Sequence, residues 1–259
     1  MSRLVVRDLA RAFGGVQAVD GVSFALGEGE LLALIGPNGA GKSTCFNLLN
    51  GQLRPDRGSI RLDGVELVGL PPRRIWRLGV GRTFQITATF ASMTVRENVQ
   101  MVLLSRHRRL LGLWRPAAAL LRDEAQALLE RVGMAGQADR PCAVLAYGDL
   151  KRVELAMALA GEPGLLLMDE PTAGMAPAER QDLMALTAAL AHEQRMAVLF
   201  TEHDMDVVFG HADRILVLDR GRPIAEGSPG AVRADPRVRA VYLGDALDDE
   251  AGDKGGDGG

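Results

Sequence analysis

Short runs of consecutive apolar residues are the clearest feature in the hydrophobic pattern of this chain. They cover residues 31–35, 164–168 and 196–201. Runs of this length, without polar alternation, are typical of strands that are buried on both faces of a parallel sheet. Because one run lies near the start of the chain and two lie in its second half, we expect both ends of the chain to build one sheet.

Turn residues separate the remaining predicted strands. Gly14-Gly15, Asp63-Gly64 and Arg220-Gly221 each interrupt a pattern that is otherwise extended, and glycine supplies the positive φ angles that tight turns need. One further strand is expected to lead out of the core. The strands and hairpins predicted in this way cover residues 3–9, 21–26, 60–65, 79–85 and 214–226.

A helical pattern replaces the extended one in the middle of the chain. It runs from residue 94 to about 161, with residues 123–132 as the clearest amphipathic piece, and a helix is also predicted at 179–194. No internal repeat is visible in the sequence. We therefore expect one α/β domain over residues 1–244. Its core lobe would comprise about 1–93 and 162–244, and its helical lobe about 94–161.

The composition of the 259 residues is that of an ordinary globular protein, with 47% hydrophobic and 24% charged residues. The net charge is −3, of which the tail after Gly244, rich in Asp and Gly, carries −5 and the remainder of the chain about +2. Such a tail has almost nothing apolar to bury, so we expect residues 245–259 to be disordered. Nothing in the charge pattern suggests a nucleic-acid partner, and we expect none.

Membrane and disulfide signals are both weak in this sequence. The N-terminus lacks the apolar core of a signal peptide, and no stretch reaches the roughly 18 apolar residues that a spanning helix needs. The two cysteines, Cys45 and Cys142, are too few for a disulfide framework and fit a reducing cytosol. Cys45 is expected to be packed rather than bridged. Any role at a membrane must therefore come through a partner.

Residues 36–44 read GPNGAGKST and match the phosphate-binding pattern G-x-x-x-x-G-K-[ST]. They stand between the apolar run 31–35 and a segment at 45–49 that can continue as a helix, which is the context that the motif requires. Glycines let successive backbone N–H groups surround one anion, and the start of the helix adds partial positive charge. The alternative, an ordinary glycine-rich turn, leaves the flanking strand and helix unexplained.

The side chains at the end of this loop have distinct expected roles. Lys42 would place its ammonium on the β- and γ-phosphates, Ser43 would offer its hydroxyl to Mg²⁺, and Thr44 would bond a nearby phosphate oxygen. The residues expected to bind the nucleotide here are Gly36, Pro37, Asn38, Gly39, Ala40, Gly41, Lys42, Ser43 and Thr44.

Two carboxylates, Asp169 and Glu170, follow directly on the apolar run 164–168. Ligands of open α/β sheets collect at the carboxyl ends of strands. Asp169 would hold Mg²⁺ through water, and Glu170 would polarise the water that attacks the phosphate. A solvated acid pair at the end of a strand is the alternative, but the phosphate-binding loop upstream favours the functional interpretation.

Five motifs occur in the order that is typical of ATP-binding-cassette (ABC) ATPases. They are the loop 36–44, Phe84-Gln85, LAYGD at 145–149, DEPTAG at 169–174, and Glu202-His203-Asp204. The chain resembles this family over about residues 3–244. The resemblance implies a P-loop NTPase fold, that of an ABC nucleotide-binding domain with a parallel-sheet core, an antiparallel β part and a helical signature subdomain. It also implies ATP and Mg²⁺ as ligands, and ATP hydrolysis as the reaction.

The resemblance assigns roles to three more side chains. Gln85 matches the glutamine that touches Mg²⁺ and links the core to the helical lobe. His203 matches the switch histidine that contacts the γ-phosphate, although a lone histidine is more often a capping or surface residue. Phe13 matches the aromatic residue that stacks on adenine, although a phenylalanine before Gly14-Gly15 could equally belong to the core. The catalytic residues implied are Glu170, His203 and Lys42.

The segment 145–149 stands where the family signature LSGGQ belongs. In the family this helix start binds the γ-phosphate of ATP held by the opposite subunit. Gly148 is kept, but Ala146 lacks the serine hydroxyl, Tyr147 replaces a glycine, and Asp149 replaces the glutamine. Asp149 brings negative charge near the nucleotide unless it accepts a hydrogen bond from the ribose. Ala176 stands where the family usually has an aspartate, which puts the usual cross-subunit hydrogen bonding of that loop in doubt.

Details of several motifs resemble the ATPase subunits of branched-chain amino-acid importers. They include Gly81-Arg82-Thr83 before Phe84-Gln85, the phrase DEPTAGM, and the ending Val241-Tyr242-Leu243-Gly244. The ATPases of urea import and of lipopolysaccharide export are close alternatives. The resemblance implies a second ATPase subunit, identical or paralogous, and an integral membrane permease as partners. A periplasmic or extracellular solute-binding protein would act indirectly. The chain would lie peripherally on the cytoplasmic face of the inner (plasma) membrane.

An insert rich in Arg and Leu lies between Met101 and Pro116. A solvated basic helix edge is the simpler interpretation, and contact of Arg106, Arg108 and Arg109 with a membrane subunit or anionic headgroups is the alternative.

Three other functions compete with that of a transporter subunit. Cassette ATPases that act on ribosomes or DNA usually carry two cassettes or a coiled-coil insert, and this chain has one cassette and no heptad run. A P-loop kinase or GTPase would leave LAYGD and Glu202-His203 unexplained. A nucleotide-binding regulator without turnover is kept open by Asp149 and Ala176.

Overall fold

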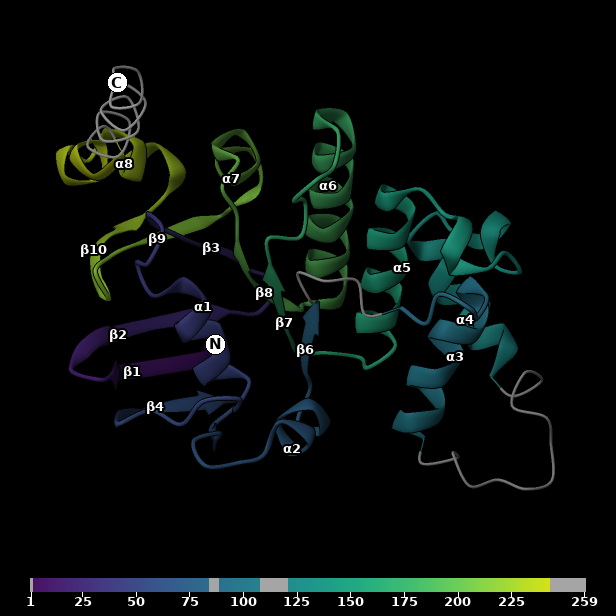
Figure 1. Ribbon diagram of the computed structural model, residues 1–259, viewed down its shortest axis with the longest axis horizontal. Coiled ribbons are helices and arrows are strands. Elements are labelled where there is room, and N and C mark those ends of the chain that lie inside the picture. The colour runs from purple at the N-terminus through teal and green to yellow at the C-terminus, as the bar shows by residue number, and fades with distance from the viewer. Residues whose placement is uncertain (1, 84–88, 108–120, 243–259) are drawn as a thin grey trace, which may run out of the picture.

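A six-stranded sheet forms the centre of the molecule (Figure 1). The computed structural model describes residues 2–83, 89–107 and 121–242. Within them the strand order is β10-β9-β3-β8-β7-β6, with β10 antiparallel to β9 and the other pairs parallel. The strands are β3 (Leu31–Ile35), β6 (Val80–Thr83), β7 (Leu165–Asp169), β8 (Ala197–Thr201), β9 (Arg214–Asp219) and β10 (Arg222–Gly227). Both ends of the chain therefore contribute to one sheet, as predicted.

Successive residues of the central strands pack alternately into two separate hydrophobic cores. In β3, Leu31, Ala33 and Ile35 pack into the core on the side of the helical lobe, whereas Leu32 and Leu34 pack into the core beneath the antiparallel sheet. Neighbouring side chains of a strand point to opposite faces, so a strand covered on both faces must be apolar throughout. This explains the uninterrupted apolar runs in the sequence.

A second, antiparallel sheet has the order β2-β1-β4-β5. Its strands are β1 (Ser2–Phe13), β2 (Val16–Gly27), β4 (Arg57–Leu62) and β5 (Val65–Glu66). The predicted strands 3–9 and 21–26 were correct in type but too short. Asp8 has a φ of 47°, and the register of β1 against β2 shifts between Val6 and Leu9. Such bulges break the alternation on which the prediction relied.

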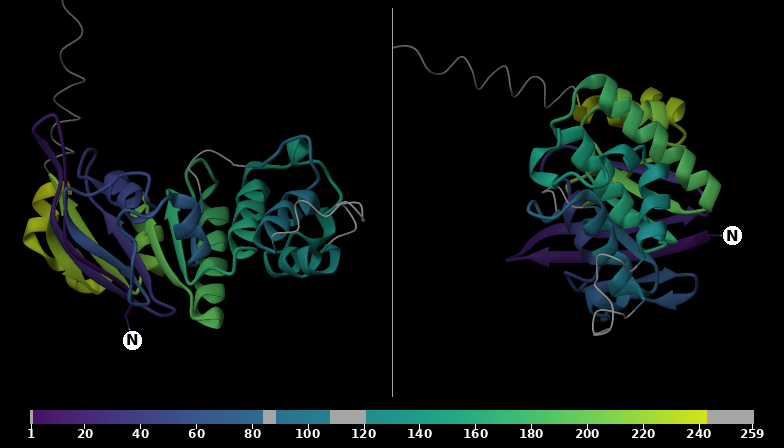
Figure 2. Two further views of the ribbon diagram at one scale, coloured as in Figure 1. Left: turned by 90° about the horizontal axis from the view of Figure 1, so that it is seen from below. Right: turned by 90° about the vertical axis from the view of Figure 1, so that its right-hand side faces the viewer.

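The helices fall into two groups. Helices α3 (Val95–Arg106), α4 (Arg122–Arg131) and α5 (Tyr147–Leu159) lie to one side of the strands, and α6 (Pro177–Gln194) stands between them and the central sheet (Figures 1 and 2). The helices that accompany the sheets are α1 (Lys42–Leu49), α2 (Pro72–Arg77), α7 (Met205–His211) and α8 (Pro229–Ala234). The exact boundaries proposed for the two lobes stay predictions.

Several predictions can be compared directly with the structure. Asp63-Gly64 and Arg220-Gly221 form the predicted turns with positive φ, and Cys45 and Cys142 are free and buried. The strand expected at 79–85 is described as β6, the edge strand of the central sheet, while residues 84–88, the insert from 108 and the tail 245–259 lie outside the described residues. Among the described helices, none has the length and apolarity that crossing a membrane requires.

Candidate active site

The loop between β3 and α1 can be built only with glycine at two positions. A Cβ atom on Gly36 would lie 2.2 Å from the carbonyl oxygen of Leu218, and one on Gly41 would lie 2.2 Å from that of Ala18. Gly41 also has a φ of 102° and is the N-cap of α1. The loop is therefore pressed against β2 and the end of β9, with the start of α1 facing the same region.

This loop forms most of the wall of a pocket of about 210 Å³. The walls come from β2, the loop itself, the end of β7 and the end of β8. The lining residues are Ala18, Asn38, Gly39, Ala40, Gly41, Lys42, Ser43, Thr44, Glu170 and His203. The fold thus brings most of the loop together with one of the two carboxylates and the histidine, both of which lie more than 120 residues after the loop in the chain. Ala18 is a lining residue that sequence reasoning missed.

Lys42 is buried at the first position of α1. Its Nζ donates to the carbonyl oxygens of Gly36 at 2.6 Å and Pro37 at 3.0 Å. Burial lowers the pKa of this ammonium group, and the negative charges of Glu170 and Asp169 oppose that shift. The lysine therefore holds the loop in shape and places a cation between the loop and the two carboxylates.

Glu170 and His203 meet at the mouth of the pocket. The Nε2 atom of His203 lies 3.0 Å from Oε1 of Glu170. Glu170 has a φ of 49°, in the left-handed region that costs free energy for a residue with a side chain. Its backbone N–H donates to the hydroxyl of Thr201 at 3.1 Å. Strand β8 thus holds a strained turn in the conformation that aims this carboxylate at the histidine.

Asp169 is the last residue of β7 and is buried behind Glu170. Thr201 donates its hydroxyl to Oδ1 at 2.9 Å, and Arg82 donates from its guanidinium to Oδ2 at 3.3 Å. Oxygen atoms of carboxylates and hydroxyls are the ligands that Mg²⁺ prefers, and Asp169 and the Ser43 hydroxyl of the loop supply one of each. The donor set therefore fits this ion.

Two further contacts fasten the Glu170 loop to the His203 loop. Glu202 accepts hydrogen bonds from the backbone N–H and the hydroxyl of Thr172, at 2.8 and 2.7 Å. Arg180 donates to the carbonyl oxygen of Met175 at 2.8 Å and to Asp204 at 2.6 Å. Burial raises the pKa of the Glu202 carboxyl. Sequence reasoning missed these contacts and that of Thr201, although Glu202 and Asp204 flank the histidine in the motif.

The other predicted site residues lie away from this pocket or outside the described residues. Phe13 is 43% exposed at the end of β1, with the Arg11 guanidinium 4.9 Å from its ring centre, so it does not belong to the core. Gln85 lies outside the described residues.

The segment 146–149 lies at the start of α5, in the helical lobe, with Ala146 as the N-cap. Asp149 accepts a hydrogen bond from Gln137 at 3.1 Å. None of the four residues of this segment lines the pocket around the loop 36–44.

Comparisons with known proteins decide the family. A family model described as "ABC transporter" matches residues 19–173. The chain belongs to the ABC transporter family. A second model, described as "Branched-chain amino acid ATP-binding cassette transporter", matches residues 222–248 of this ABC ATPase.

Similar proteins span nearly the whole length of the chain. The high-affinity branched-chain amino acid transport ATP-binding protein LivG of Salmonella typhimurium is 43% identical, covering 94% of this chain and 98% of its own. The corresponding protein BraF of Pseudomonas aeruginosa is 43% identical, covering 95% of this chain and 100% of its own. A solved ABC transporter cassette in its ADP conformation has a TM-score of 0.84 and 30% identity, covering 94% of this chain and 99% of its own.

These findings confirm the predicted fold class and the predicted activity. The protein is an ATP-binding and ATP-hydrolysing subunit of an ABC transporter. Homologous ABC ATPases work as dimers with membrane permease components, and the partners and location of this subunit stay predictions. The predicted roles of the individual site residues stay predictions.

Proposed function

We propose that this ABC ATPase drives the import of branched-chain amino acids or related small polar solutes through a separate permease. The observation that carries the proposal is the 43% identity to LivG and BraF over nearly the whole of each chain. The match of residues 222–248 to the branched-chain family model agrees with it. The ATPase would lie peripherally on the cytoplasmic face of the inner membrane, and a solute-binding protein would act on it only through the permease.

Within one subunit, the pocket at the loop 36–44 would hold the triphosphate of ATP. The loop and the first residues of α1 line this volume, and backbone N–H groups at such a loop and helix start bind phosphate. Lys42 would exchange its carbonyl partners for phosphate oxygens. Ser43 and Asp169 would hold Mg²⁺, together with Gln85, and the ion would supply charge neutralisation of the phosphates.

Glu170 and His203 would act on the attacking water. Their side chains already contact each other at 3.0 Å at the pocket mouth. Glu170 would accept a hydrogen bond from the water and orient it, and His203 would fix the Glu170 carboxylate and donate to the γ-phosphate. Phe13 would stack on the adenine at the exposed end of β1.

The segment 146–149 would act on the nucleotide of a second subunit. It begins α5 and does not line the pocket of its own chain. Two chains, identical or paralogous, would therefore close head to tail over two ATP molecules. The helix start at Ala146 and Gly148 supplies backbone N–H groups for the γ-phosphate.

One variant separates chemistry from binding. We expect Glu170→Gln to lower ATP turnover at least 100-fold, on the order of the loss seen when an essential catalytic group is removed, while MgATP affinity stays close to that of the wild type. Turnover is measured as phosphate release by the ATPase with its permease, and affinity with a fluorescent nucleotide. Undiminished turnover would assign the base to another residue.

The cargo needs a second experiment. The complete transporter in vesicles, with its binding protein, should show ATPase stimulation by leucine, isoleucine or valine and none by urea. Stimulation by urea instead, or none by any amino acid, would overturn the proposed solute class but leave the ATPase assignment standing.

A further inference from the structure

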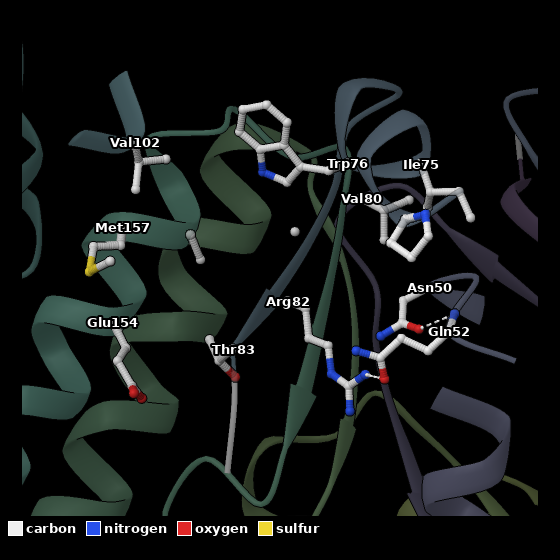
Figure 3. A pocket seen from close by; sticks show the side chains of 13 residues that line it. Asn50, Gln52, Ile75, Trp76, Val80, Arg82, Thr83, Val102, Glu154 and Met157 are labelled. Carbon is white, nitrogen blue, oxygen red and sulfur yellow. Dashed lines mark hydrogen bonds between the residues drawn. The ribbon is translucent and has the colours of Figure 1, made fainter. Parts of the chain in front are cut away.

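A second pocket, of about 270 Å³, lies between the core and the helical lobe (Figure 3). Its walls come from the turn after α1 and from α2, β6, α3 and α5. Trp76 and Val102 form part of its apolar lining, and Arg82 of β6 is its one arginine among the described residues. The guanidinium of Arg82 points away from Trp76 and toward Gln52 in Figure 3. This places its charged group at the edge of the pocket that lies toward the nucleotide site.

Arg82 joins three parts of the core through hydrogen bonds. One guanidinium nitrogen donates to Asn47 Oδ1 on α1 at 3.0 Å and to Gln52 Oε1 in the following turn at 3.2 Å. The other donates to Oδ2 of Asp169 at the end of β7, at 3.3 Å. A lysine could not make this set of contacts, because its ammonium lacks the planar fork that spreads the donors of arginine.

The contact with Asp169 is not an exposed ion pair. The side chains of Arg82 and Asp169 are 14% and 10% exposed, so water screens the interaction far less than it screens a surface pair. Thr201 holds the other oxygen of the same carboxylate at 2.9 Å. With one partner on each oxygen, Asp169 has little freedom to rotate. Hydrogen bonds of this kind orient the carboxylates that hold metal ions.

We propose that Arg82 is a positioning residue for ATP hydrolysis, holding the Asp169 carboxylate in the orientation that Mg²⁺ requires and fixing it to the phosphate-loop helix through Asn47. The inference rests on the metal role proposed for Asp169. The positive guanidinium does not oppose metal binding, because Mg²⁺ would arrive on ATP in a complex of net negative charge. Through these two contacts Arg82 links α1 to the end of β7.

The test compares Arg82→Met, which keeps the length of the stem, with Arg82→Lys, which keeps the charge. Mg²⁺ is expected to increase the affinity for ATP, and the titration measures the Mg²⁺ concentration that gives half of this increase. We expect both variants to raise that concentration about tenfold, the usual effect of removing a partner of a metal ligand. Affinity for ATP without Mg²⁺ should stay within about twofold of the wild type. In steady state, kcat should fall about tenfold while the KM for MgATP changes little.

The matched control is Arg77→Met. Arg77 is an exposed arginine on α2 that follows Trp76, so its replacement should leave all these values unchanged.

Metal-free thermal unfolding separates positioning from a merely structural role. If Arg82→Met lowers the unfolding midpoint but leaves the Mg²⁺ dependence of ATP affinity as in the wild type, the proposal is overturned. Should Arg82→Met not fold, the same comparison with Arg82→Lys decides the matter.

Asp169→Asn distinguishes this inference from the function on which it rests. A shifted Mg²⁺ dependence in Asp169→Asn, without one in the Arg82 variants, overturns the role of Arg82 alone. No shift in Asp169→Asn overturns the metal assignment of Asp169 and the role of Arg82 with it.

Discussion

At the scale of single residues, the strictest requirement in the site is steric. Gly41 cannot carry a Cβ atom without a 2.2 Å contact to the carbonyl oxygen of Ala18, whereas a Cβ on Gly39 would meet nothing within 4 Å. Both residues have positive φ. A comparison of alanine substitutions at the two positions therefore separates the steric cost of the close approach to β2 from the cost of the backbone conformation.

We expect Gly39→Ala to destabilise the nucleotide-free protein by about 1 kcal/mol, the usual cost of a left-handed conformation for a residue with a side chain. Gly41→Ala should cost clearly more, because the backbone of β2 or of the loop must move. Urea unfolding without nucleotide measures both. Equal losses in the two variants would show that the contact with Ala18 relaxes at no cost.

The burial of Glu202 predicts that the free energy of unfolding depends on pH. Burial is the main cause of its raised pKa, and the hydrogen bonds from Thr172 oppose the shift. A carboxyl whose pKa is raised on folding binds its proton more tightly in the folded state. Its favourable contribution is complete below the ordinary value of 4.5, and it is lost as the pH rises through the raised value.

Glutamine at this position does not titrate. The free energy of unfolding of the wild type relative to Glu202→Gln should therefore fall as the pH rises from 4.5 toward neutrality. Urea unfolding of both proteins across this range measures the difference. A difference that grows with pH would mean that the hydrogen bonds to the charged carboxylate outweigh its burial.

The sequence predicted those site residues that are recognised by their position within a short local motif. Lys42 was found because it follows glycines at fixed positions, and Glu170 because it ends a buried strand. Arg82, Thr201 and Glu202 act through partners 30 or more residues away in the chain. Such partners become visible only when the neighbours of each strand are known. Arg82 is part of the motif Gly81-Arg82-Thr83, but nothing in the sequence indicated that its side chain would contact Asp169.

At the scale of elements, burial decided what could be predicted. Strands β3, β7 and β8 were predicted closely because they are apolar on both faces. Helices α2, α7 and α8 were not predicted. They have six, seven and six residues, which is under two turns and too short for a helical period to emerge from a sequence.

The helical lobe is anchored where α3 begins. Asn98 is fully buried. It accepts from the backbone N–H of Phe90 at 2.7 Å and donates to the carbonyl oxygens of Phe90 at 3.2 Å and Thr94 at 2.9 Å. One side chain thus fastens the segment before α3 to the first turn of that helix.

We expect Asn98→Ala to lower the free energy of unfolding by about 2–3 kcal/mol, since it removes the hydrogen bonds of a fully buried amide and leaves the backbone N–H of Phe90 without its acceptor. Ser105→Ala, an exposed change in the last turn of the same helix, should stay within about 0.5 kcal/mol of the wild type. Urea unfolding measures both, and hydrogen exchange should show faster opening of residues 90–99 in the first variant alone. A loss of under 1 kcal/mol in Asn98→Ala would mean that water replaces the missing amide.

At the scale of the whole molecule, the proposed function divides each ATP site between two chains. The pocket at the loop 36–44 lies in the core, and the segment 146–149 lies at the start of α5 in the helical lobe (Figure 1). Because the segment lines no part of its own pocket, the proposed contact of its helix start with a γ-phosphate requires a second chain. Ala146 is exposed, so this surface is open to a partner.

A charge at Ala146 tests that arrangement. With MgATP, Glu170→Gln should form a dimer of twice the 27.7 kDa chain mass, because ATP that is not hydrolysed keeps two chains closed. Adding Ala146→Glu places a carboxylate against the γ-phosphate of the opposite chain, and like charges in a closed interface cost several kcal/mol. The double variant should therefore stay monomeric while it binds ATP in its own pocket.

The control adds Ala143→Glu to Glu170→Gln instead. Ala143 is another exposed position of the same lobe, so this change should leave the dimer intact. Light scattering after size exclusion measures the mass, and a dimer that survives Ala146→Glu would place the start of α5 outside the interface.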